Sequence, residues 1–109
     1  SNSLGNRITV STYLASQKME QLRSIPFDNA SLNDSNVNSL DVDQANYNET
    51  TTMPLAGGFR TRWNVRTVAA FGTSLKFLAV RTESTNPAGR FTRAEFTSFR
   101  SCTLTGCLP

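Results

Sequence analysis

Apolar residues in the first quarter of the chain recur at the period of an α-helix. They are separated by four, seven, four and three positions and are Leu4, Ile8, Ala15, Met19 and Leu22. Such spacings bring side chains onto one face of a helix. Pro26 disfavours the helical conformation at the residue before it. The pattern therefore predicts a helix over residues 4–25, with Ala15, Met19 and Leu22 facing the core of the domain.

The second half of the chain follows the two-residue period of β-strands. Over residues 59–67 the alternation predicts two different faces: Phe59, Thr61, Trp63 and Val65 on one, and Arg60, Arg62, Asn64 and Arg66 on the other. Further strands are predicted over residues 75–82 and 91–101, and turn residues precede each of them. Consecutive strands joined by short turns indicate an antiparallel meander.

The apolar face of this meander determines the fold class. The alternation places five large apolar residues on it: Trp63, Val65, Leu78, Val80 and Phe96. Such a face must be buried against another element, and the N-terminal helix is available to cover it. We therefore expect an α+β fold, in which the long helix packs on a three- to four-stranded antiparallel meander.

A polar segment connects the helix to the first predicted strand. Residues 26–58 are rich in Asn, Asp, Ser and Thr and show neither period, so we expect a loop attached to the sheet, with room for a short helical turn or strand. A chain of 109 residues is sized for one domain. The expected organisation is a cloning remnant at 1–3 and a single domain at 4–109, made of helix 4–25, loop 26–58, sheet 59–101 and tail 102–109.

Composition argues against an enzyme. The chain has no histidine, which removes the commonest general base and the commonest metal ligand. In the sheet region the only carboxylates are Glu83 and Glu95, on different strands, and we expect Glu95 to pair with Arg93 or Arg100. No apolar run is long enough to cross a bilayer. We therefore expect no catalytic residues and no metal site.

The two cysteines lie close together near the C-terminus. Cys102 and Cys107 are too few for a zinc site and do not have the spacing of a thiol oxidoreductase motif. A small disulfide loop that fixes the tail is the favoured interpretation, and it indicates an oxidising compartment. Two free thiols in the tail are the alternative.

The order of these parts resembles the type IV pilin and pseudopilin superfamily. The end of the helix, YLASQKMEQLRSIPF at 13–27, is similar to the L-A-x-x-K-M-E-x-L-R-x-x-P-F segment of minor pilins and of the minor pseudopilins of type II secretion. The strand that begins at Phe59 and contains Trp63 and Val65 is similar to the first strand of those proteins. Arg81 and Thr82 depart from the family, in which an aromatic residue often ends the second strand.

The resemblance implies a structural subunit of a bacterial type IV pilus or of a type II secretion pseudopilus. Such subunits hold an apolar half-helix in the inner membrane and then assemble with other pilins or pseudopilins into a filament. This sequence does not contain that half-helix, and we expect it to have been removed. The helix face that the sheet leaves uncovered would contact neighbouring subunits, with Leu4, Ile8 and Tyr13 as candidates. The expected location is the periplasm or cell surface, with anchoring in the inner membrane before assembly.

Two binding alternatives remain open. Arg60, Arg62 and Arg66 on one strand face could contact DNA phosphates, as in minor pilins that take up DNA, although a solvated strand face is the more ordinary interpretation. Calcium is the second alternative. The polar segment offers carboxylate ligands at Asp28, Asp34, Asp41 and Asp43, but their spacing is not that of an EF-hand, and no cofactor is expected.

Overall fold

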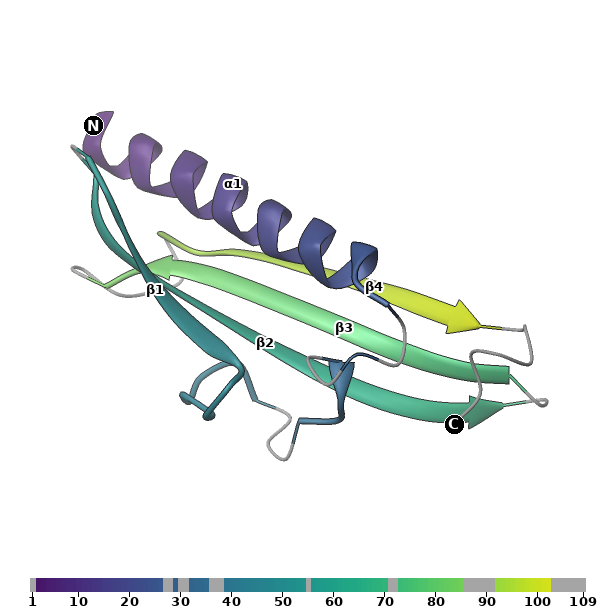
Figure 1. The fold of residues 1–109 in the computed structure, drawn as a ribbon. Helices are drawn as coiled ribbons and strands as arrows, with labels where there is room; N and C mark the ends of the chain where they lie inside the picture. Colours follow the sequence, from purple (N-terminus) through teal and green to yellow (C-terminus); the bar gives the residue numbers. More distant parts are fainter. Residues whose placement is uncertain are drawn as a thin grey trace.

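The computed structural model describes residues 2–26, 29, 32–35, 39–54, 56–70, 73–85 and 92–102. These residues form one helix, α1 (Asn2–Ser24), and one sheet of four antiparallel strands. The strands follow one another in chain order: β1 (Asn48–Met53), β2 (Gly57–Ala70), β3 (Thr73–Ser84) and β4 (Ala94–Cys102). The helix lies along one face of the sheet in a molecule of 51 × 21 × 19 Å (Figure 1). The predicted α+β architecture is confirmed.

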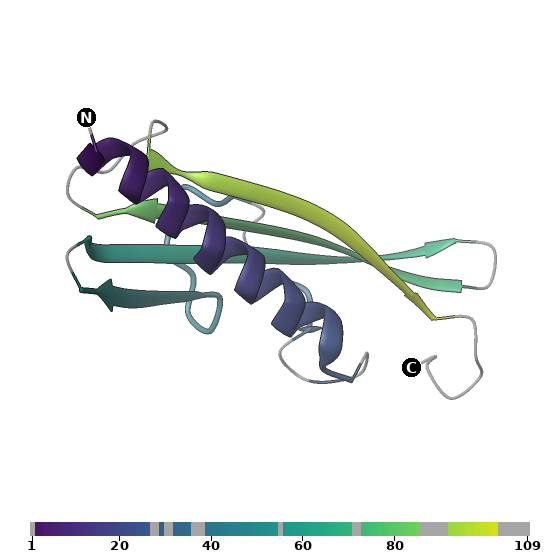
Figure 2. The ribbon, with the colours of Figure 1, turned by 90° about the horizontal axis from the view of Figure 1, so that it is seen from above.

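The helix ends where Pro26 requires it to end, and one side chain from β4 binds carbonyl groups at this end. Arg100 Nη1 donates to the carbonyl oxygens of Leu22 (3.0 Å) and Ile25 (2.6 Å). A cation at this position also interacts favourably with the helix dipole. The helix crosses the sheet diagonally and packs mainly on β3 and β4 (Figure 2). Within the described residues, no helix is both long and apolar enough to span a membrane.

The core lies between the helix and the sheet. It consists of Ala15, Met19 and Leu22 from α1, Trp63 and Val65 from β2, Leu78 and Val80 from β3, and Leu32 from the connecting segment. The predicted placement of Ala15, Met19 and Leu22 in the core is therefore confirmed. Phe96 lies opposite Val80 in the register but remains 36% exposed. It contributes less to the core than expected because β4 is an edge strand with a neighbour on one side only.

The sheet has four strands, the larger of the two predicted numbers, and the additional strand lies in the polar segment. The supposed loop 26–58 contains β1, which pairs with β2 from Asn48 opposite Arg62 to Met53 opposite Gly57. Gly57 has a φ of 91°, which glycine adopts without strain at the turn between these strands. β3 is two residues longer at each end than the predicted 75–82, and β4 begins at residue 94 rather than 91.

The segment between α1 and β1 passes from one face of the sheet to the other. Leu32 is buried on the helix side, and Ser35 then pairs with the edge of β2 through hydrogen bonds to both backbone groups of Val65. Residues 39–46 lie beneath the opposite face before the chain enters β1 (Figure 1). The polar segment thus brings its carboxylates to the face of the sheet that the helix does not cover.

Candidate functional site

The first candidate surface is the uncovered side of α1. Ile8 is 41% exposed and Tyr13 is 56% exposed, whereas the side chain of Leu4 lies outside the described residues. Five positions separate Ile8 from Tyr13, which places them about 140° apart around a helix of 3.6 residues per turn. The two side chains are therefore available to partners, but they do not form a single apolar stripe.

Small and polar side chains surround these two residues. Thr12 donates a hydrogen bond from Oγ1 to the carbonyl oxygen of Ile8 (2.9 Å), and Gln17 Nε2 donates to Tyr13 Oη (3.3 Å). Ser16 is exposed beside them on the same helix. Because these side chains are short or lie along the helix surface, another helix could approach this side closely. The arrangement suits contact with a protein and offers no constellation of catalytic groups.

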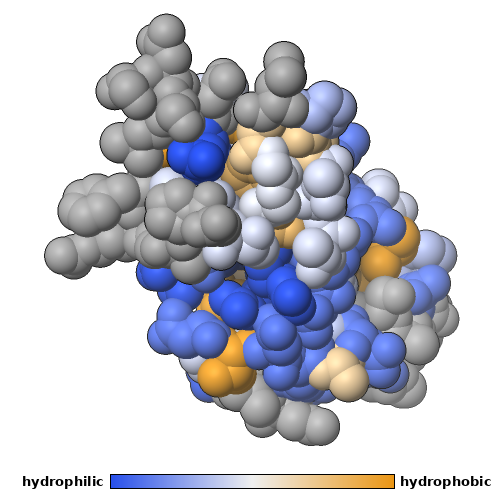
Figure 3. Space-filling model, turned by 90° about the vertical axis from the view of Figure 1, so that its left-hand side faces the viewer, coloured by the Kyte–Doolittle hydropathy of each residue, from blue (hydrophilic) through white to orange (hydrophobic). Residues whose placement is uncertain are grey.

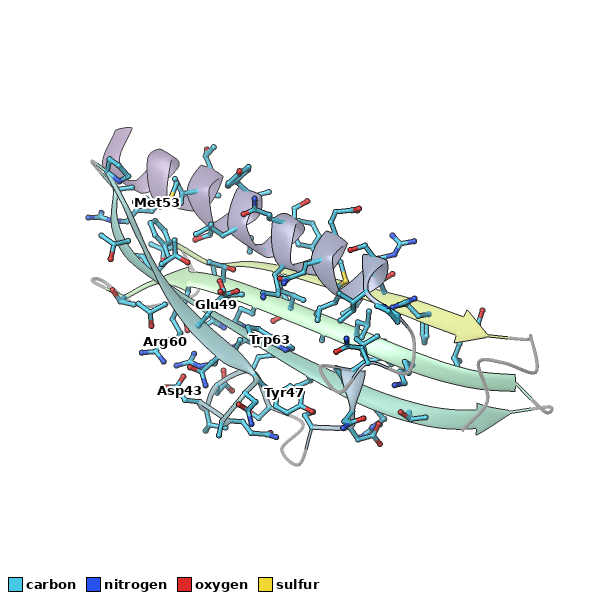
Figure 4. All side chains as sticks on the ribbon, in the orientation of Figure 1. Asp43, Tyr47, Glu49, Met53, Arg60 and Trp63 are labelled. Atoms are coloured by element: carbon cyan, nitrogen blue, oxygen red, sulfur yellow. The ribbon has the colours of Figure 1, made fainter. Side chains whose placement is uncertain are left out.

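The second candidate surface is the arginine-bearing face of β2. Arg60, Arg62 and Arg66 all lie on the face opposite the helix, as the alternation predicted, because the residues between them are buried. Arg60 and Arg62 both bind the carboxylate of Asp43, at 2.9 and 2.7 Å (Figure 4). Arg62 also contacts Glu83 through Nη1, at 3.0 Å. Two of the three predicted phosphate-binding arginines are thus engaged within the protein.

This cluster extends across the sheet. Arg81 binds Asp41 and, at 2.6 Å, Glu95, while Arg93 binds the second oxygen of Glu83 at 3.3 Å. The expected pairing of Glu95 with Arg93 or Arg100 is wrong. Arg81 stands directly opposite Glu95 in the register, whereas Arg100 lies on the helix side of the sheet. The cluster therefore contains four arginines and four carboxylates, in two groups of ion pairs: one around Glu83 and Asp43, and one around Arg81.

The carboxylates of the connecting segment respond to their arginine partners. The hydrogen bond from Arg81, together with its charge, lowers the pKa of Asp41. The hydrogen bond from Arg62 likewise lowers the pKa of Asp43. Burial raises the pKa of Tyr47, to which the charge of Asp34 also contributes. Both aspartates are therefore held in the charged form that the ion pairs require.

The predicted calcium ligands are used differently. Asp34 accepts a hydrogen bond from the backbone N–H of Thr67 (2.8 Å), Asp41 and Asp43 bind arginines, and Asp28 lies outside the described residues. No group of three potential ligands from His, Cys, Asp and Glu occurs in the part of the chain that the structure describes. Two of the four carboxylates that sequence reasoning offered to calcium, Asp41 and Asp43, thus pair with arginines of the sheet.

Sequence reasoning missed a contact that joins the helix to the sheet. Lys18 Nζ lies 4.3 Å from the centre of the Trp63 ring and 2.8 Å from Glu49 on β1. Figure 4 labels Trp63 and Glu49 on the strands below the helix. The Lys18 side chain is only 11% exposed, so the aromatic ring and the carboxylate replace most of its hydration. The sequence pattern does not indicate this contact, because Glu49 lies on β1 and the position of that strand was not predicted.

Sequence reasoning also missed the partners of the arginines, although a signal was present. The signal was the presence of two carboxylates, Asp41 and Asp43, in the segment that precedes the arginine-bearing strand. Their spacing does not give the pairs, because Asp43 binds both Arg60 and Arg62, whereas Asp41 binds Arg81 on β3. The predicted disulfide between Cys102 and Cys107 cannot be compared with the structure, because Cys107 and the side chain of Cys102 lie outside the described residues.

Comparisons with protein-family models, with curated proteins and with solved structures find no match to this chain.

Proposed function

We propose that this chain is the globular head of a filament subunit, of the kind found in type IV pili and type II secretion pseudopili. The observation that carries the proposal is a single 23-residue helix that uses one side to pack on an antiparallel sheet and leaves Ile8 and Tyr13 exposed on the rest. A helix of this length spans about 34 Å at 1.5 Å per residue, which suits repeated contact along a fibre axis.

The proposed role is assembly rather than catalysis. The exposed side of α1 would contact the helices of neighbouring subunits, while the sheet and its connecting segment would form the outer part of the filament. In this proposal the native helix continues before Leu4 into an apolar half that anchors the subunit in the inner membrane until assembly. The partners are then other pilins or pseudopilins, and the location is the periplasm or cell surface.

The test is incorporation of the full-length native protein into filaments in the producing cells. Tyr13→Arg places a charge and a longer side chain on the exposed helix face, so we expect the sheared filament fraction to lose the subunit. Thr52→Arg is the matched control, because Thr52 is also exposed but lies on β1, opposite Gly58. Circular dichroism melting of the isolated domain should be unchanged in both variants. Filaments that contain Tyr13→Arg at the wild-type level would refute this use of the helix.

A further inference from the structure

The face of the sheet opposite the helix is divided into a charged half and an apolar half. The register places Arg62, Arg81 and Glu95 in one row of cross-strand neighbours. The segment 39–46 covers this charged half, since Arg62 Nη1 also reaches the carbonyl oxygen of Leu40 (3.3 Å). Further along the same strands the neighbours on this face become apolar, with Val68 opposite Leu75 and Phe77 opposite Phe99.

An apolar shelf forms in the uncovered half, from Val68 on β2, Leu75 and Phe77 on β3, and Phe99 on β4. Val68 is 43% exposed and Phe99 is 58% exposed. The rings of Phe77 and Phe99 meet edge to face with their centres 5.0 Å apart. By contrast, the coloured surface at the opposite end of the molecule is mostly hydrophilic, with only small hydrophobic areas (Figure 3). Exposed aromatic pairs of this kind are typical of binding surfaces.

A hollow adjoins the shelf where the connecting segment meets the sheet. Its volume is about 410 Å³, which is within the usual range of ligand pockets. Its apolar lining comes from Leu40, Phe77 and Ala79, and its polar lining includes Asn64, Ser39 and the ion pair of Asp41 with Arg81. The hollow and the shelf share Phe77, so they form one continuous surface.

Arg66 is the cation of this surface. It lines the hollow, is exposed, and stands directly opposite Phe77 in the register. The six ion pairs of this face engage Arg60, Arg62, Arg81 and Arg93, and Arg66 takes part in none of those among the described residues. The surface therefore carries a positive charge that the neighbouring carboxylates leave unmatched, next to apolar side chains.

We propose that the hollow and the apolar shelf bind a peptide segment of another protein that carries an acidic side chain two residues from an aromatic one. The carboxylate would pair with Arg66, and the aromatic ring would pack on Phe77 and Phe99. Arg66, Phe77 and Phe99 occupy three neighbouring strands, a span of about 10 Å at 4.8 Å per strand. An extended peptide covers that span with about three residues. The inference does not depend on the proposed filament.

The test uses the peptide acetyl-Ser-Glu-Thr-Phe-Thr-Glu-Ser-amide, in which either chain direction brings an acid to Arg66. Amide correlation spectra of the domain should shift at Asn64, Phe77 and Ala79. Arg66→Gln should weaken binding about tenfold, because charge-assisted hydrogen bonds to a carboxylate are lost. Arg23→Gln, which changes an exposed arginine on α1, should leave the affinity unchanged. Phe99→Ser should weaken binding several-fold while the melting temperature stays near that of the wild type.

Control ligands separate this proposal from others. The same peptide with Gln in place of both Glu residues should bind about as weakly to the wild type as the acidic peptide binds to Arg66→Gln. The proposal would be overturned by spectra without shifts at millimolar peptide, or by equal affinity of the wild type and Arg66→Gln. Equally tight binding of phenylpropionate would assign the surface to a small aromatic acid instead. A dimer in sedimentation that Arg66→Gln dissolves would assign it to a second copy of the chain.

Discussion

Glu83 is the carboxylate on which the charged cluster depends most. Its side chain is 11% exposed and binds Arg62 at 3.0 Å and Arg93 at 3.3 Å. Glu83→Gln keeps the shape and one acceptor oxygen but removes the charge. The hydrogen bond to the remaining oxygen then falls from about 1.5–3 kcal/mol to roughly 1 kcal/mol, and the other arginine loses its acceptor because the amide NH2 only donates. We expect the free energy of unfolding to fall by about 2 kcal/mol, because Arg62 keeps Asp43 and Arg93 is 30% exposed.

The assay is urea unfolding followed by the fluorescence of Trp63, which is the only tryptophan and is 9% exposed in the core. For a chain of this length, 2 kcal/mol corresponds to a melting temperature lower by roughly 9 °C. Glu95→Gln is the control, because the Glu95 side chain is 44% exposed and its pair with Arg81 should contribute less than about 1 kcal/mol. If Glu83→Gln and Glu95→Gln lose equal stability, or if neither differs from the wild type, the cluster does not stabilise the sheet as described.

Three further predictions concern the helix and the connecting segment. Met19→Ala should lower the free energy of unfolding by about 2–4 kcal/mol, because Met19 is 7% exposed in the core and the shorter side chain leaves a cavity. Urea unfolding measures this change. A smaller loss of stability than for an alanine substitution at an exposed helix position would contradict the packing. Ser11→Ala should lower the free energy of unfolding by about 1–2 kcal/mol, because Ser11 Oγ donates to the carbonyl oxygen of Thr92 at 2.6 Å in a buried site. Ser16→Ala, on the exposed side of α1, is the control and should leave the stability unchanged. The lowered pKa values of Asp41 and Asp43 contribute stability that is present above the ordinary aspartate value of 3.8 and is lost as the pH falls through the lowered folded-state values. Unfolding curves of the wild type and of the Asp41→Asn, Asp43→Asn double variant should therefore converge in acid, and a constant difference down to the acid limit would refute the linkage.

The helix and the long strands were predictable because each carries a strong local signal. The stripe through Ala15, Met19 and Leu22 and the stop at Pro26 define α1, and alternation from Phe59 to Val65 defines β2. The fourth strand was allowed for, but its position was not predicted, because Asn48–Met53 is an edge strand whose residues are nearly all polar and half or fully exposed. Its strand conformation comes from hydrogen bonds to β2 rather than from its own pattern.

The candidate surfaces were predictable only in part, for a related reason. Exposure of Ile8 and Tyr13 follows from the helical period, once the core residues are assigned. The hollow beside Arg66 depends on where the connecting segment crosses the sheet and on the exact register of β2 and β3. Those are non-local pairings, and a period along the chain does not contain them.

The central claim is that the exposed side of α1 contacts other subunits in a filament. A photoreactive phenylalanine analogue at position 13 of the full-length native protein tests it most directly, with the same analogue at Thr50 on β1 as the control. The account predicts that illumination of producing cells links position 13, but not position 50, to another filament subunit. Absence of any link at position 13 in cells that make filaments containing the protein would contradict it.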